Sequence, residues 1–189
     1  MRNSISAALF AALIAVSCFI AIPAGALGVP IVLQNMMVIL TGLLLGGVRG
    51  AAAVGLFIIL GALGLPIFSG GRGGLAVLLG PTGGFIAGYF FGALAAGLIA
   101  GKPAISKKSF QYIRIAVAAI IGFTLIYCFG TVRIMYLIMQ KQSMSIISAF
   151  ERALPMAVLP FTVGDLLKLI VLIPLSIKLR PIAARYINK

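Results

Sequence analysis

The stretch GALGLPIFSGGRGGLAVLLGPTGGFIAGYFFG, residues 61–92, breaks an apolar sequence at two points. The first break is a proline at position 66 followed by the glycine-rich loop 69–74, and the second is GPTGG at 80–84. Backbone groups in such loops cannot face hydrocarbon, where each unsatisfied N–H or C=O costs several kcal/mol. Glycine also lets the backbone approach a ligand closely and offer it main-chain donors. We therefore predict that this loop lies outside the lipid or lines an enclosed cavity, and that it borders a binding site.

The composition is that of a polytopic membrane protein. Of the 189 residues, 62% are hydrophobic and 9% charged, and the mean hydropathy is +1.24. A soluble domain cannot keep that much apolar surface from water, and at about 20 residues per span the chain holds about six helices. We predict one all-α membrane domain over residues 1–189, with a basic tail at 178–189. The expected spans are residues 4–22, 32–47, a third ending near 63, 81–100, 115–129 and 156–177, with a break at 28–31, a short re-entrant segment at 75–79 and interfacial helices over 130–152.

Basic residues outnumber acidic ones by 15 to 2, which gives a net charge of +13. In a soluble protein this balance would suggest nucleic acid, but here the cations stand between spans and act as orientation signals. With an internal N-terminus, ten of them fall inside, namely Arg2, Arg49, Lys102, Lys107, Lys108, Arg114, Lys178, Arg180, Arg185 and Lys189, and four outside, namely Arg72, Arg133, Lys141 and Arg152. This asymmetry predicts that both termini are inside and that the glycine loop is outside.

Several classes of chemistry are disfavoured by what the sequence lacks. It has no histidine, and its two cysteines, Cys18 and Cys128, stand far apart in apolar runs, so we expect no metal site, disulfide framework or cofactor. Two acidic residues, Glu151 and Asp165, are too few for a proton-relay chain. The nucleotide-binding pattern GxxxxGK[ST] is also missing, so we expect any energy source to be another subunit.

Small residues recur at four-residue spacing in the first apolar segment. Ala7, Ala11 and Ala15 form one row, and Ala8 and Ala12 lie beside it. Such rows let membrane helices approach closely, and the pattern leaves two interpretations open, contact with a partner subunit or packing within the chain. A similar column runs from position 80 to 100, where we expect helix packing in its lower part and a cavity beside its upper part.

Asp165 and Lys168 stand one helical turn apart in the last apolar segment, so they lie on the same helix face. Each charge costs roughly 2.5–3.5 kcal/mol at the centre of a membrane helix, so the two should pair and face protein or water. One interpretation is an ion pair with no other task. The other is a ligand site, in which a urea or amide group suits both residues together and a carboxylate suits Lys168 alone.

Four segments resemble the BioY family, the biotin-specific S components of energy-coupling-factor (ECF) transporters. They are VPIVLQN at 29–35, GLPIF at 64–68 with the glycine pairs 70–71 and 73–74, GPTGGF at 80–85, and PFTVGDLLK at 160–168. The segments occur in the family's order and spread over most of the chain. Two features depart from the family pattern: Arg72, where the family generally has a smaller or uncharged residue, and residues 128–136.

The resemblance implies a six-helix S-component fold in a prokaryotic cytoplasmic membrane, with a biotin pocket near the outer face. It also implies a transmembrane coupling subunit and ATPase subunits as partners, with Ala7, Ala8, Ala11, Ala12 and Ala15 as the contact. The expected ligand residues are Gln34, Asn35, Phe68, Ser69, Gly70, Gly71, Arg72, Gly73, Gly74, Thr82, Gly83, Gly84, Phe85, Tyr89, Asp165 and Lys168, with loop 69–74 as a lid. Alternatives are an S component for another vitamin and, in a different class, a membrane enzyme that acts on lipids.

Overall fold

The computed structural model describes residues 2–22, 31–103, 110–142 and 144–187. The elements are α1 Arg2–Val16, η1 Ser17–Phe19, β1 Ala21–Ile22, β2 Ile31–Val32, α2 Gln34–Leu45, α3 Gly47–Ala62, α4 Leu75–Leu79, α5 Gly83–Ala100, α6 Phe110–Gln142 and α7 Ile146–Ile187. The all-α class is confirmed, since the antiparallel pair β1–β2 has only two residues in each strand. Most of the predicted break at 28–31 lies outside the described residues, as do Lys107, Lys108 and Lys189.

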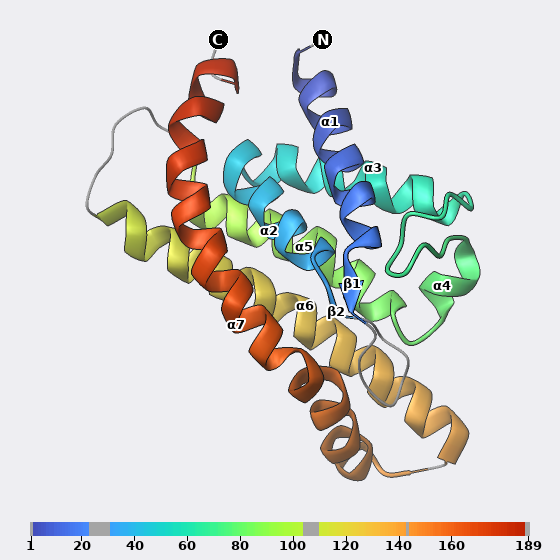
Figure 1. Ribbon diagram of the computed structural model, residues 1–189. Helices are drawn as coiled ribbons and strands as arrows, with labels where there is room; N and C mark the ends of the chain where they lie inside the picture. Colours follow the sequence, from blue (N-terminus) through green and yellow to red (C-terminus); the bar gives the residue numbers. More distant parts are fainter. Residues whose placement is uncertain (1, 23–30, 104–109, 143, 188–189) are drawn as a thin grey trace.

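The helices form one bundle with two distinct ends (Figure 1). The start of α1 and the end of α7 lie together at one end, which we call the terminal end. The two longest helices, α6 and α7, run antiparallel and pack along each other, and they join at the opposite end, which we call the hairpin end. Three helices, α5, α6 and α7, are long and apolar enough to cross a membrane, and α1, α2 and α3 are shorter apolar helices.

The two long helices correct the predicted interfacial segment over 130–152. α6 continues to Gln142, and α7 begins at Ile146 and passes through Pro155, Pro160, Pro174 and Pro181. Gly130 lies inside α6 and does not end it. A glycine is needed there because a Cβ at that position would lie 2.4 Å from the ring of Phe85. Membrane helices tolerate proline because neighbouring groups satisfy the freed carbonyls. The predicted basic tail is likewise helical as far as Ile187.

The small-residue column of α5 is a packing surface against α6. A Cβ on Gly84 would lie 2.4 Å from the Phe129 carbonyl oxygen, and one on Gly88 would lie 2.8 Å from Ile126 Cα. Both neighbours are on α6, and only glycine permits backbones to come this close. The expectation that the upper part of this column faces a cavity is therefore wrong at Gly84.

The alanine rows of α1 face in different directions. Ala11 is only 3% exposed and belongs to the hydrophobic core, whereas Ala8 and Ala12 are exposed and Ala7 and Ala15 are half-buried. α1 packs against α3 and α2. The expectation that Ala11 contacts a partner subunit is therefore wrong, because Ala11 packs inside the chain. The alanines that face outward are Ala8 and Ala12.

A buried arginine ties three helices together at the terminal end. Arg180 of α7 is 2% exposed, and its guanidinium donates to Leu43 O at 2.5 Å, Ala100 O at 2.9 Å, Gly101 O at 2.9 Å and Lys102 O at 3.1 Å. These carbonyls belong to the C-terminal ends of α2 and α5 and to the two residues after α5, where helix dipoles concentrate negative partial charge. Arg180 is therefore a structural cation and not a residue of a solvated tail.

Candidate ligand-binding site

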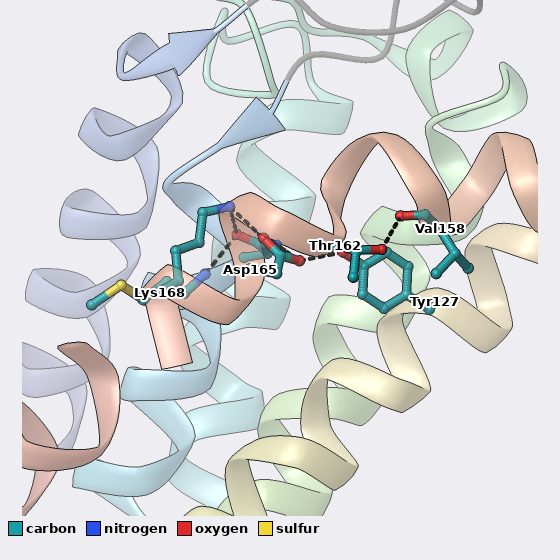
Figure 2. Close-up of polar contacts among 7 residues, drawn as sticks. Tyr127, Val158, Thr162, Asp165 and Lys168 are labelled. Carbon is teal, nitrogen blue, oxygen red and sulfur yellow. Dashed lines mark hydrogen bonds and ion pairs between the residues drawn. The ribbon is translucent and has the colours of Figure 1, made fainter. Parts of the chain in front are cut away.

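Four polar side chains from three helices meet at the middle of α7. They are Asn35 at the start of α2, Tyr127 of α6, and Asp165 and Lys168 of α7, and we call them the polar tetrad. Lys168 Nζ lies 2.6 Å from Asp165 Oδ1, and the two side chains are 12% and 7% exposed. Figure 2 shows Asp165 between Lys168 on one side and Tyr127 on the other. The predicted pairing of the two charges on one helix face is confirmed.

The carboxylate of Asp165 is satisfied by three neighbouring groups. Asn35 Nδ2 donates to its Oδ1 at 3.1 Å and its Oδ2 at 2.9 Å, and the Tyr127 hydroxyl also donates to Oδ2. Lys168 Nζ donates to Asp165 Oδ1 and, at 2.9 Å, to Asn35 Oδ1. The opposite charges of Asp165 and Lys168 are thus both paired and hydrogen-bonded within the tetrad, as burial requires, and the pair has no net charge.

Two aromatic rings, Phe85 and Phe161, lie beside the ring of the tetrad residue Tyr127. The ring centroids of Phe85 and Phe161 are 6.1 Å apart, and each is 6.4 Å from that of Tyr127. Phe85 and Phe161 are 9% and 8% exposed. The Tyr127 hydroxyl donates to Asp165, so Tyr127 connects the aromatic side chains to the polar tetrad. A mostly apolar wall with a few convergent polar groups is typical of small-molecule sites.

A second network connects the glycine loop to α1 and α2. Gln34 is fully buried, and its Nε2 donates to Ile67 O at 2.8 Å and to Ile14 O at 3.2 Å. Its Oε1 accepts from Ser69 Oγ at 3.3 Å. Tyr89 of α5 is also buried, at 3% exposed. This network fixes the base of the loop beside the tetrad.

The loop between α3 and α4 is a tight turn anchored by Phe68. That side chain is fully buried against Phe57, at a centroid distance of 5.5 Å, and its ring comes so close to Gly61 that a Cβ there would lie 2.3 Å away. Phe68 N donates to Arg72 O at 2.8 Å, and the turn between them places Gly70 and Gly71 at φ 75° and 70°. Only glycine adopts this left-handed backbone without strain.

Several predicted site glycines have packing roles that need no ligand. A Cβ on Gly73 would lie 2.2 Å from Leu65 O, and one on Gly83 would collide with Leu78 O. Gly74 has φ 90° and donates its N–H to Gly61 O at 2.7 Å. The Thr82 hydroxyl donates to Val77 O at 3.4 Å, across the turn between α4 and α5.

A model of the BioY family matches residues 1–185 of the chain. The chain belongs to the BioY family. The biotin transporter BioY of Thermotoga maritima is 35% identical over 180 residues, which cover 95% of this chain and 96% of the relative. The biotin transporter BioY of Rhodobacter capsulatus is 41% identical over 182 residues, which cover 90% of this chain and 88% of the relative.

The fold of this BioY-family chain is also similar to that of a solved structure. The crystal structure of the S-component for biotin from an ECF-type ABC transporter matches with a TM-score of 0.76 and 26% identity, covering 95% of this chain and 90% of that chain. The predicted family and the S-component fold are confirmed.

For this BioY-family chain, sequence reasoning brought together three of the four tetrad residues and missed Tyr127. It also treated Gln34 and Asn35 as one polar pair. In the structure Gln34 hydrogen-bonds the glycine loop, whereas Asn35 hydrogen-bonds Asp165. Phe161 was noted in the family motif but not as a wall of the site. The signal for Tyr127 is a hydroxyl in a mostly apolar span, which it shares with Thr124.

Proposed function

We propose that this BioY-family protein binds biotin with high affinity and supports its uptake as the S component of an ATP-driven ECF transporter. The family match over residues 1–185 and the likeness to an S-component for biotin support the ligand and the transport role. The single observation that carries the site assignment is the polar tetrad, in which Asn35, Tyr127 and Lys168 hydrogen-bond the carboxylate of Asp165 beside the rings of Phe85 and Phe161. The protein is a transport subunit and not an enzyme.

The tetrad fits the ureido ring of biotin. That ring has two N–H donors and one carbonyl acceptor and carries no charge. Asp165 and Asn35 offer acceptors, and Lys168 and Tyr127 offer donors, so the same four residues can exchange hydrogen bonds with both the N–H groups and the carbonyl of a urea. The apolar rings of Phe85 and Phe161 suit the rest of the bicyclic group, and the Gly70–Gly71 turn is the part of the loop free to act as a lid.

Partner subunits supply the energy in this proposal. The chain lacks a nucleotide-binding loop, so ATP-driven uptake requires ATPase subunits and a transmembrane coupling subunit. The outward alanines Ala8 and Ala12 of α1 allow a second helix to approach closely, which makes this face the proposed contact. We place the protein in the cytoplasmic membrane of a prokaryote, with both termini in the cytoplasm and the glycine loop outside.

Equilibrium binding to the purified protein in detergent tests the proposed ligand. Biotin, riboflavin and thiamine are compared by calorimetry on the same preparation. We expect saturable binding of biotin at one site and none of the other two vitamins. Binding of another vitamin without biotin would favour the rival S-component assignment, and hydrolysis of added phospholipid would favour a membrane enzyme.

A further inference from the structure

The loop that borders the site carries a cation without a matching anion. Arg72 is exposed, and its Nε donates to Ser69 O at 3.2 Å. In the described part of the chain the carboxylates are Asp165, which pairs with Lys168, and Glu151 at the exposed start of α7. Arg72 makes no ion pair with either of them, so its charge is available to a ligand.

Ser69 connects this cation to the tetrad. The carbonyl of Ser69 accepts from the Arg72 guanidinium, and its hydroxyl donates to Gln34 Oε1. Gln34 immediately precedes the tetrad residue Asn35 at the start of α2. Ser69 thus links the Arg72 guanidinium to Gln34, the chain neighbour of the tetrad residue Asn35.

The charge of the tetrad decides which end of an acidic ligand it accepts. Lys168 Nζ already donates to Asp165 Oδ1 and Asn35 Oδ1, at 2.6 and 2.9 Å. A second carboxylate at Lys168 would compete with Asp165 and stand next to a like charge, which disfavours the charged forms of both. A neutral ring meets no such repulsion, so the carboxylate of the ligand must find its cation elsewhere.

We infer that Arg72 binds the carboxylate of the ligand while the polar tetrad holds its neutral ring. This inference rests on the proposed function and adds to it the orientation of the ligand and a residue that selects for an acidic tail. A guanidinium suits the task because it can hold a carboxylate with two parallel hydrogen bonds. Arg133 is the other cation beside this loop region, but its guanidinium donates to Leu79 O and Gly80 O. Arg133 therefore fixes the end of α4.

The test compares biotin with biotin amide, in which a neutral carboxamide replaces the carboxylate. Dissociation constants are measured by calorimetry for the native protein, Arg72→Gln, Arg72→Lys and the matched control Arg133→Gln. We expect Arg72→Gln to weaken biotin binding at least tenfold and to leave biotin amide binding unchanged. Arg72→Lys should keep part of the preference for biotin, because it retains the charge but not the paired hydrogen bonds. Arg133→Gln should keep the native ratio of the two affinities.

Each outcome separates this inference from the proposed function. Unchanged biotin binding by Arg72→Gln would overturn the role of Arg72 and leave the proposed function intact. An equal loss for biotin and biotin amide would also overturn it, since it would mean that Arg72 only shapes the loop. Failure of the native protein to bind biotin at all would instead contradict the proposed function.

Discussion

At the scale of single residues, the central feature is one carboxylate with four accepted hydrogen bonds. Asp165 receives them from Asn35, Tyr127 and Lys168. Breaking a buried ion pair by removing one partner costs roughly 3–5 kcal/mol, whereas replacing both partners by apolar or neutral groups is often neutral. This difference offers a way to separate the stability of the pair from its role in binding.

We predict that Asp165→Asn and Lys168→Met each lower both the unfolding temperature and the affinity for biotin. The double variant Asp165→Asn with Lys168→Met should regain much of the stability, because no unpaired charge remains, and should still bind biotin at least tenfold more weakly. Thermal unfolding and calorimetry on the same preparations provide the two readouts. If the double variant binds biotin as tightly as the native protein, the pair serves stability alone.

The charged residues of the site were predictable because an unpaired charge in an apolar membrane helix is energetically costly. Two opposite charges one helical turn apart lower this cost by forming an ion pair. Tyr127 was not predictable in the same way, since a tyrosine is tolerated in an apolar helix without any partner. The separate tasks of Gln34 and Asn35 depend on which side of α2 each one faces. That in turn depends on where α2 begins, and helix starts are poorly defined by sequence.

At the scale of elements, the structure depends on helices that continue through residues normally associated with helix ends. Gly130 lies inside α6, and four prolines lie inside α7. Near Pro160 the Thr162 hydroxyl donates to Val158 O at 3.0 Å and adds a bond within that turn (Figure 2). The sequence predicted interfacial helices over 130–152 because glycine and polar residues usually end apolar spans. Packing of Gly130 against Phe85 outweighs that local preference.

Arg180 should be required for stability and not for ligand recognition. We predict that Arg180→Gln lowers the unfolding temperature, because carbonyls at the ends of α2 and α5 lose their donors, at roughly 1–3 kcal/mol for each acceptor left buried and unsatisfied. Arg180→Lys should recover only part of the loss, since an ammonium cannot reach all four carbonyls. Below the unfolding temperature, both variants should bind biotin like the native protein. Native-like thermal unfolding of Arg180→Gln would contradict this role.

The two faces of α1 allow a matched pair of substitutions. Ala12→Trp places a bulky group on the exposed face, so we expect native biotin binding but reduced co-purification with the coupling subunit and reduced uptake. Ala11→Trp places the same group in the core and should destabilise the isolated protein. Unchanged co-purification and uptake with Ala12→Trp would exclude this face as the contact.

At the scale of the whole molecule, the ends of the chain and the connection between α6 and α7 lie at opposite ends of the bundle (Figure 1). Three exposed cations belong to segments near the ends of these helices: Lys102 follows α5, Arg114 lies in the first turns of α6, and Lys178 lies in the last third of α7. Two further exposed cations, Lys141 and Arg152, flank the connection between α6 and α7. The excess of cations that the sequence assigns to the side of the termini favours a cytoplasmic location for both of them.

We predict that a cysteine at Gln140 is labelled by an impermeant maleimide in intact cells and that a cysteine at Lys178 is not. Both positions are exposed: Gln140 lies two residues before the end of α6, beside the connection to α7, and Lys178 lies toward the C-terminal end of α7. The substitutions Gln140→Cys and Lys178→Cys are made in a protein whose Cys18 and Cys128 are replaced by alanine. Labelling of both after permeabilisation is the control, and the reverse pattern in intact cells would invert the orientation.

The neutrality of the polar tetrad has a consequence for the behaviour of the protein in an energised membrane. A lone charge carried across the full membrane potential changes in energy by about 2.3 kcal/mol per 100 mV, whereas the paired Asp165 and Lys168 have opposite charges at nearly the same depth. The electric field therefore exerts almost no net force on the empty site. With the carboxylate of the ligand kept at Arg72, little charge enters the field on binding. Affinities measured in detergent, where no voltage exists, should then equal those in polarised vesicles.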